Sequence, residues 1–267
     1  MAILKLPTQK EIKRYATLLN VLVKYGFEDV LSNSAFSKII PKKYLENHPD
    51  IEQNLSFSKY ERIRMVLEEL GPTYVKLGQI FSTREDMLPA ELITELEKLQ
   101  DHLPMLKNFD VLKTIEAELG TENFRYFATI NIEPLAAASL AQVHRAQLIN
   151  GDEVILKIQR PNIEEIIESD LLVMKQLAHS LEKYSSQAEA LQPLRIIESF
   201  ERSIKEELQF SRELKNTVQF TENFEGNMHI HVPDIYEDLS NDKIICMEFI
   251  DGIKVSEQLL KLGLTFI

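Results

Sequence analysis

The sequence is poor in cysteine and in long apolar runs, and each shortage excludes a class of protein. Its single cysteine, Cys246, cannot form an internal disulfide or a cysteine-rich zinc site, and it lies in an apolar segment, so we expect an inert core residue. No apolar run is long enough to span a bilayer, and residues 1–9 lack the apolar core of a signal peptide. We therefore expect a cytoplasmic location.

Cationic side chains are also scarce. The sequence has 30 Lys and Arg residues and 42 Asp and Glu residues, which gives a formal net charge of -12. Sequence-independent binding to a nucleic-acid backbone requires clustered cations, so we expect no nucleic-acid partner. The 267 residues, of which 44% are hydrophobic, are enough to bury the core of one or two domains.

The first part of the chain has the apolar spacing of helices, from Glu11 to about Leu119, with breaks at prolines and at Gly71-Pro72. A helix predicted over residues 11–30 has its apolar side chains on one face. Two alternatives fit this face: a helix that lies on a membrane surface, or a helix packed into the core of the protein. We favour the second, which is the more common use of such a face.

Strand signals begin at Ile130 and define five segments, 130–134, 142–149, 153–159, 231–236 and 243–249. Asn150-Gly151, between the second and third segments, is typical of a hairpin turn because both residues tolerate positive φ. Helices over residues 163–184 and 193–224 separate the third strand from the fourth, and Asp251-Gly252 opens a last helix. The pattern predicts an α+β fold, in which a helical region precedes a five-stranded antiparallel sheet with inserted helices.

A loop of small residues and a lysine inside a strand are the first candidates for chemistry. The loop, Leu135 to Ala141, lets backbone N–H groups approach phosphates, although a tightly packed corner has the same composition. Lys157 lies in the apolar run Val-Ile-Leu-Lys-Ile, one hairpin after this loop. Protein kinases carry their phosphate-binding lysine on such a strand. The alternative is an edge-strand lysine that reaches solvent, and the preceding loop favours the first interpretation.

Such a lysine requires an acidic partner, and the long predicted helix offers Glu206, Glu207 and Glu213. Gln209 and Glu213 would share one polar face of that helix, opposite its apolar stripe. We therefore expect Glu213 to pair with Lys157, although a solvated surface charge would fit the same spacing.

Four stretches resemble the UbiB family of atypical kinase-like proteins, also called AarF or ADCK proteins, and they occur in the family's order. They are Lys76-Leu77-Gly78-Gln79, Ala136 to Ser139 with Gln142 to Ala146, Lys157 to Pro161, and Glu207 to Asn216. The resemblance implies a protein-kinase-like N-lobe preceded by a helical extension that folds over the active site. By this resemblance, residues 1–125 form the extension, 126–252 the N-lobe with its inserted helices, and 253–267 the start of a second lobe.

The resemblance also implies a role for each motif. The alanine-rich loop replaces the glycine-rich loop of ordinary kinases and covers the nucleotide phosphates, and the last strand resembles the hinge that holds adenine. The residues expected to bind ATP or ADP are Ala136, Ala137, Ala138, Ser139, Lys157, Glu213, Glu248 and Ile250. Those expected to regulate the site, from the extension and the acidic motif, are Lys76, Gln79, Glu207 and Gln209.

The sequence departs from the family at two points. Where the family has a Glu-x-Asp pair, this chain has Glu207-Leu208-Gln209; a neutral amide cannot replace the second carboxylate, so we expect altered nucleotide or metal handling. No His-x-Asp-x-x-x-x-Asn catalytic loop and no Asp-Phe-Gly motif occurs, and the sequence ends where the lobe carrying both is expected. We therefore assign no catalytic residue to this chain, and we expect Mg²⁺ only where the second lobe is supplied, for example by a separate chain.

No metal site is assigned either, because the pair His229 and His231 lacks further ligands at a suitable spacing. Two functions stay open. The first is the nucleotide-binding part of an atypical kinase or ATPase linked, by resemblance, to isoprenoid quinone biosynthesis, with a lipid or quinone-pathway partner at the inner face of a membrane. The second is a catalytically inactive interaction or membrane-associated module. The presence or absence of the second lobe would distinguish them.

Overall fold

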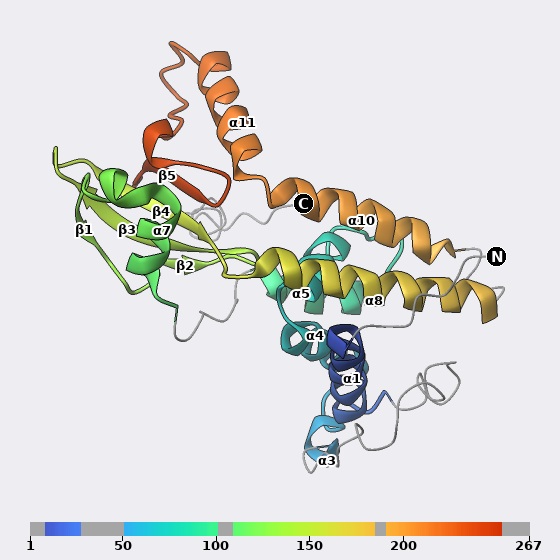
Figure 1. Ribbon diagram of the computed structural model, residues 1–267. Helices are drawn as coiled ribbons and strands as arrows, with labels where there is room; N and C mark the ends of the chain where they lie inside the picture. The colour runs from blue at the N-terminus through green and yellow to red at the C-terminus, as the bar shows by residue number, and fades with distance from the viewer. Residues whose placement is uncertain (1–8, 28–50, 101–108, 185–190, 253–267) are drawn as a thin grey trace, which may run out of the picture. The chain divides into compact units, whose positions relative to one another are not determined.

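The computed structural model describes residues 9–27, 51–100, 109–184 and 191–252 (Figure 1). The chain divides into two compact units, each assembled from separate stretches of sequence. The first comprises Met1–Lys107, Ala137–Gln142 and Gln159–Gln209, and the second comprises Asn108–Ala136, Val143–Ile158 and Phe210–Ile267. The domain boundaries expected from the resemblance, near residues 125 and 252, stay a prediction.

The first unit is helical. Ser58 begins one helix with a capping box, in which its hydroxyl accepts the Glu61 N–H and the Glu61 carboxylate accepts the Ser58 N–H. Gly71, at φ +100°, ends that helix, and Pro72 starts the next, where no N–H is required. The elements are α1 (Gln9–Lys24), α3 (Ile51–Asn54), α4 (Lys59–Leu70), α5 (Pro72–Phe81), α6 (Ala90–Glu97), η3 (Lys98–Gln100), α8 (Ile163–Tyr184) and α10 (Pro193–Glu207).

Apolar side chains of α1, α4, α5, α8 and α10 form the core of this unit. Tyr15, Leu18 and Val21 of α1 lie in that core, so the apolar face of α1 packs against the protein. Phe200 and Ile204 are the buried side chains of α10, as the apolar spacing predicts. The core-packing interpretation of the first helix is therefore confirmed, although α1 ends earlier than expected.

Most of the sheet lies in the second unit (Figure 1). Its antiparallel strands follow the order β1-β3-β4-β5, and β2 pairs with β3. Strand β4 buries Val154, Leu156 and Ile158 at alternating positions, which turns Lys157 toward the opposite face. The elements are α7 (Val111–Phe124), β1 (Phe127–Ile130), β2 (Ala136–Ala137), β3 (Ala141–Leu148), β4 (Glu153–Gln159), α11 (Phe210–Asn223), η4 (Glu237–Leu239) and β5 (Ile244–Glu248).

The predicted α+β fold with a five-stranded antiparallel sheet is confirmed, but one strand was placed wrongly. Residues 231–236 form no strand, and only Ile235 makes an isolated bridge, to Met247. Pro233 has no N–H to donate to a strand ladder, which explains the interruption. The fifth strand is instead the short β2, inside the small-residue loop. The first strand is also shifted, because β1 covers Phe127–Ile130 rather than residues 130–134.

The long helix predicted over residues 193–224 is two helices, α10 and α11. Between them, the Gln209 N–H bonds to the Glu206 carbonyl, three residues back. The Phe210 N–H then donates to the carbonyl of Asp242 instead of to the preceding turn. This tertiary hydrogen bond breaks the helix, so Gln209 does not share a helical face with Glu213, and that prediction was wrong.

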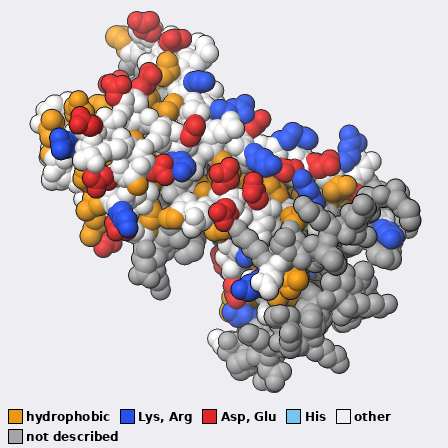
Figure 2. Space-filling model, in the orientation of Figure 1, with side chains coloured by type: hydrophobic (Ala, Val, Ile, Leu, Met, Phe, Trp, Pro, Cys, Tyr) orange, Lys and Arg blue, Asp and Glu red, His pale blue; other side chains and the backbone are white. Residues whose placement is uncertain are grey.

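Over the ranges that the structure describes, no helix is both long enough and apolar enough to cross a membrane. Figure 2 shows both acidic and basic side chains on the drawn face. The predicted helix that follows Gly252 lies outside the described residues.

Candidate functional site

In the second unit, the ammonium of Lys157 contacts the carboxylate of Glu213. Nζ of Lys157 donates to both carboxylate oxygens, at 2.7 and 2.6 Å. The two side chains keep exposed fractions of 23% and 38%, so the pair is only partly withdrawn from water. The ammonium also lies 4.9 Å from the centre of the Phe210 ring, within the range of a cation–π contact. Lys157 is therefore held from two directions and still reaches solvent.

Secondary structure accounts for this placement. Glu213 stands in the first turn of α11, where the helix dipole favours an anion. Phe210 anchors the start of α11, because its ring is buried and its N–H bonds to the Asp242 carbonyl. Lys157 is fixed by the pairing of β4 with β5, in which it lies opposite Ile245. Both charged groups thus project from a helix and a strand, which hold a geometry better than loops do.

In the first unit, a second lysine and glutamate form a pair. Nζ of Lys76, on α5, lies 2.6 Å from a carboxylate oxygen of Glu207, at the end of α10. The side chains are 21% and 34% exposed. Of the three glutamates that the sequence offered, Glu207 therefore contacts Lys76, Glu213 contacts Lys157, and Glu206 is exposed.

Gly78 and Gln79, the last two residues of the Lys76-Leu77-Gly78-Gln79 motif, fix the position of α5. A Cβ atom on Gly78 would lie 2.4 Å from the side chain of Leu99, so only glycine allows this approach. The amide of Gln79 donates to the Leu99 carbonyl at 2.9 Å. Gln79 is thus bonded to a neighbouring backbone, and Lys76 supplies the motif's ion pair.

The alanine-rich loop is closed by its own backbone and by an arginine. The Ala138 N–H donates to the Ala141 carbonyl at 2.9 Å. The guanidinium of Arg160 donates to the Ala138 carbonyl through two nitrogens, at 3.0 and 3.3 Å, and its backbone N–H donates to the Leu140 carbonyl. Ser139 is buried, whereas Ala137 and Ala138 are half-buried. Arg160 therefore sets the conformation of residues 138–140.

Ala136, the remaining loop residue expected to bind nucleotide, begins β2 and is exposed. Arg160 lies in the stretch Lys157 to Pro161 that resembles the family, but no spacing rule predicts that an arginine after a strand contacts this loop.

We call the contact of the Arg160 guanidinium with the Ala138 carbonyl the Arg160 clamp. Removing this clamp is expected to loosen the alanine-rich loop. In an Arg160→Met variant the Ala138 carbonyl loses two charge-assisted donors, so amide hydrogen exchange of residues 138–140 should accelerate by about tenfold or more. Arg145→Met is the matched control, because Arg145 is half-exposed and pairs with Glu153. Hydrogen exchange read by mass spectrometry measures both. Equal exchange of residues 138–140 in the Arg160 variant and the unsubstituted chain would contradict the assigned clamp.

The two hinge residues expected to hold adenine differ in their surroundings. The Glu248 carboxylate contacts Nε2 of His231 at 2.8 Å and accepts the Asp234 N–H at 3.2 Å. The Glu248 N–H donates to the Asp234 carbonyl at 2.8 Å. Ile250 is 44% exposed. The Glu248 side chain therefore holds the 231–234 segment, and its role toward adenine stays a prediction.

The remaining candidates of the sequence are accounted for in the same way. Gln209 is exposed between α10 and α11, and altered metal handling there stays a prediction. Cys246 is fully buried, and burial raises the pKa of its thiol to about 12, so the thiol is protonated and unreactive at neutral pH. Among the residues that the structure describes, no group of three or more His, Cys, Asp and Glu side chains could hold a metal ion.

Comparisons with known proteins agree with the motifs. The family model described as the ABC1 atypical kinase-like domain matches residues 98–262. A probable protein kinase UbiB of Pseudomonas fluorescens strain Pf0-1 is 36% identical over 253 residues, which cover 92% of this chain and 46% of that protein. A probable protein kinase UbiB of Aliivibrio fischeri strain MJ11 is 37% identical over 260 residues, which cover 96% and 48%. The chain thus spans about half the length of the curated relatives it matches.

A solved structure is also similar. It is the complex of Rv3197 with erythromycin from Mycobacterium tuberculosis, with a TM-score of 0.52 and 27% sequence identity. The match covers 80% of this chain and 54% of that one.

Proposed function

The chain belongs to the ABC1 atypical kinase-like family, and from this premise we propose that it is the nucleotide-binding part of a UbiB-type kinase or ATPase. The observation that carries the proposal is the contact between Lys157 and Glu213. In protein kinases a strand lysine pairs with a helix glutamate, and this pair must be in place for phosphoryl transfer. Here the strand is β4 and the helix is α11, and both lie in one compact unit.

The geometry of Lys157 suits an ammonium that binds phosphate. Glu213 accepts two of its three N–H groups, which leaves one donor. The side chain is 23% exposed, so this third donor can reach a phosphate oxygen of ATP or ADP. The carboxylate fixes the direction of the ammonium, so little side-chain entropy is lost when phosphate binds.

The other expected nucleotide contacts are part of the same proposal. Ala136 to Ser139 would cover the phosphates, with Arg160 setting the loop, and the backbone around Glu248 and Ile250 would hold the base. Lys76 and Glu207 join α5 to α10 and would set the position of the extension. Mg²⁺ neutralises phosphate charge during transfer, and we propose it only together with a second kinase lobe, which carries the metal ligands in protein kinases.

The pathway is proposed from the relatives. The relatives from Pseudomonas fluorescens and Aliivibrio fischeri are each named probable protein kinase UbiB, which supports a place in isoprenoid quinone biosynthesis for the whole protein. A peripheral position at the inner face of a membrane, with a lipid or quinone-pathway partner, is part of that proposal.

Loss of the Lys157 ammonium is expected to weaken nucleotide binding. A Lys157→Met variant removes one charge-assisted hydrogen bond to phosphate, so its affinity for ATP and ADP should fall by about tenfold to a hundredfold. Calorimetry of the 267-residue chain with each nucleotide, with and without Mg²⁺, measures this. Lys215→Met is the matched control, because Lys215 is an exposed lysine on the same helix as Glu213. An equal loss of nucleotide affinity in both variants would contradict the proposal, and so would the absence of nucleotide binding to the unsubstituted chain. Either result would favour the second function, a catalytically inactive interaction module.

A further inference from the structure

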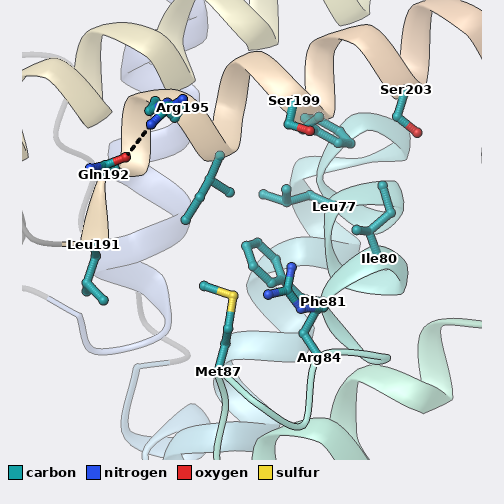
Figure 3. A pocket seen from close by; sticks show the side chains of 12 residues that line it. Leu77, Ile80, Phe81, Arg84, Met87, Leu191, Gln192, Arg195, Ser199 and Ser203 are labelled. Atoms are coloured by element: carbon teal, nitrogen blue, oxygen red, sulfur yellow. Dashed lines mark hydrogen bonds between the residues drawn. The ribbon is translucent and has the colours of Figure 1, made fainter.

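A cavity of about 510 Å³ opens in the first unit between α5 and α10. Its volume falls within the roughly 300–1,000 Å³ typical of small-molecule sites. Figure 3 shows Leu77 and Phe81 of α5 on one side and the row from Arg195 to Ser203 of α10 on the other. Neither Lys157 nor Glu213 lines it. The proposed nucleotide contacts therefore give this cavity no role.

One wall of the cavity is apolar. Leu77, Ile80 and Phe81 line it from α5, and Met87 lines it from the segment that follows α5. In Figure 3 the thioether of Met87 points into the space between the two helices. Hydrocarbon that enters this space would leave water and contact these side chains, which favours an apolar ligand body.

A polar row faces this wall. Arg195, Ser199 and Ser203 are spaced four residues apart on α10 and lie along one side of the helix. Over the described ranges, the hydroxyls of Ser199 and Ser203 have no hydrogen-bond partner in the protein. The row thus offers a cation at one end and two hydroxyl donors along its length.

The charge of the lining favours an anion. Among the residues that the structure describes, no Asp or Glu lines the cavity, although the whole chain has 42 acidic and 30 basic side chains. Arg84 is neutralised by Asp86, whose two oxygens accept at 2.8 and 2.7 Å. Arg195 differs, because within the described residues its guanidinium contacts only the neutral amide oxygen of Gln192, at 3.0 Å. A nearby carboxylate, Glu182, accepts the Leu194 N–H and is not part of the lining.

We propose that this cavity binds a small amphipathic anion. A carboxylate or phosphate would contact Arg195 and the hydroxyl of Ser199, and a medium-length hydrocarbon chain would lie against Leu77 and Phe81. A free fatty acid or alkyl phosphate and a membrane lipid present this same chemistry. The proposal does not depend on nucleotide binding.

Calorimetry with decanoate, below its micelle concentration, tests this site on the 267-residue chain. We expect saturable binding, and decanol, which lacks the charge, should bind about tenfold more weakly or worse. The Arg195→Gln substitution should lower the affinity for decanoate by about tenfold or more. Arg202→Gln is the control and should change the affinity for decanoate by less than about twofold, because Arg202 is exposed on the same helix and does not line the cavity.

A second variant tests the location. Ser199 is exposed, so Ser199→Trp should fold normally and fill the space between the helices, which abolishes decanoate binding. The proposal is overturned if the chain shows no saturable decanoate binding, if decanol binds as tightly as decanoate, or if Ser199→Trp binds decanoate unchanged.

Vesicles distinguish the two sources of the ligand. If phosphatidylcholine vesicles that contain phosphatidylglycerol compete with decanoate, and Ser199→Trp removes their binding, the anion is a membrane lipid. If decanoate binds and the vesicles do not compete, the anion is a free amphiphile. Either result supports the site.

Discussion

Replacing Arg14 by methionine is expected to destabilise the first unit by about 3–5 kcal/mol, the cost of leaving a buried charge without its partner. Nε of Arg14, on α1, donates to the carboxylate of Asp170, on α8, whose side chain is 0% exposed. The same guanidinium donates to the Leu70 carbonyl at 2.6 Å and lies over the Tyr74 ring. One side chain thus joins α1 to α4, α5 and α8. Chemical denaturation at neutral pH measures the loss.

The pH dependence of this effect has a definite sign. Burial raises the pKa of Asp170 above its ordinary 3.8, and Arg14 opposes that rise, so the pKa climbs further in Arg14→Met. The folded variant then binds a proton more tightly than the unfolded chain, and its stability falls as pH rises from about 3.8 through the folded-state pKa. The difference from the unsubstituted chain should therefore be largest at neutral pH and shrink toward pH 4.

A matched control is available on the same helix. Lys24 of α1 pairs with Glu69, but both side chains are about one-third exposed, at 29% and 35%. Lys24→Met should cost at most about 1 kcal/mol and show little pH dependence near neutrality. Removing both buried partners, Arg14→Met with Asp170→Leu, should recover much of the stability. Comparable losses for Arg14→Met and Lys24→Met would show that Asp170 does not depend on Arg14.

Gly78→Val is expected to destabilise the first unit by about 3 kcal/mol through overpacking. A Cβ atom at this position would lie 2.4 Å from the side chain of Leu99 and 3.0 Å from that of Leu67. Leu99 is 0% exposed and cannot move aside without displacing the core. The better helix propensity of a non-glycine residue offsets less than 1 kcal/mol of this cost. Thermal or chemical denaturation measures the difference.

A double-mutant cycle isolates the contact. Gly78→Ala adds only the Cβ atom, and Leu99→Ala removes the side chain that it would meet. If crowding is the cause, the double variant should be more stable than the sum of the two single effects predicts. Additive losses would assign the requirement for Gly78 to its backbone instead.

Local chemistry made several features predictable. Gly151 adopts φ +96° in the turn between β3 and β4, as expected for a turn glycine, and its N–H bonds to the Leu148 carbonyl. The apolar alternation of β4 placed Lys157 on the face opposite the buried residues. These predictions depend only on neighbours in the sequence, which is why they could be made.

Features set by distant residues could not be predicted. The break between α10 and α11 has no proline or glycine to signal it, and it depends on a hydrogen bond from Phe210 to Asp242. Spacing alone did not separate Glu207 from Glu213 as partners of Lys157, because Lys76 comes from a remote helix. The clamp of Arg160 on Ala138 likewise joins segments that only the fold brings together. Pro233, by contrast, is a local signal against a strand over residues 231–236, because proline has no N–H to donate to a strand ladder.

The measurement that tests nucleotide binding most directly is affinity labelling of the 267-residue chain with an acyl phosphate derivative of ADP. Such a reagent transfers its acyl group to an amine beside the bound phosphates and releases the nucleotide phosphate. We expect mass spectrometry to find the label on Lys157, and excess ADP to prevent it. Labelling spread over exposed lysines such as Lys215, or labelling of Lys157 that ADP does not reduce, would contradict the proposed nucleotide site.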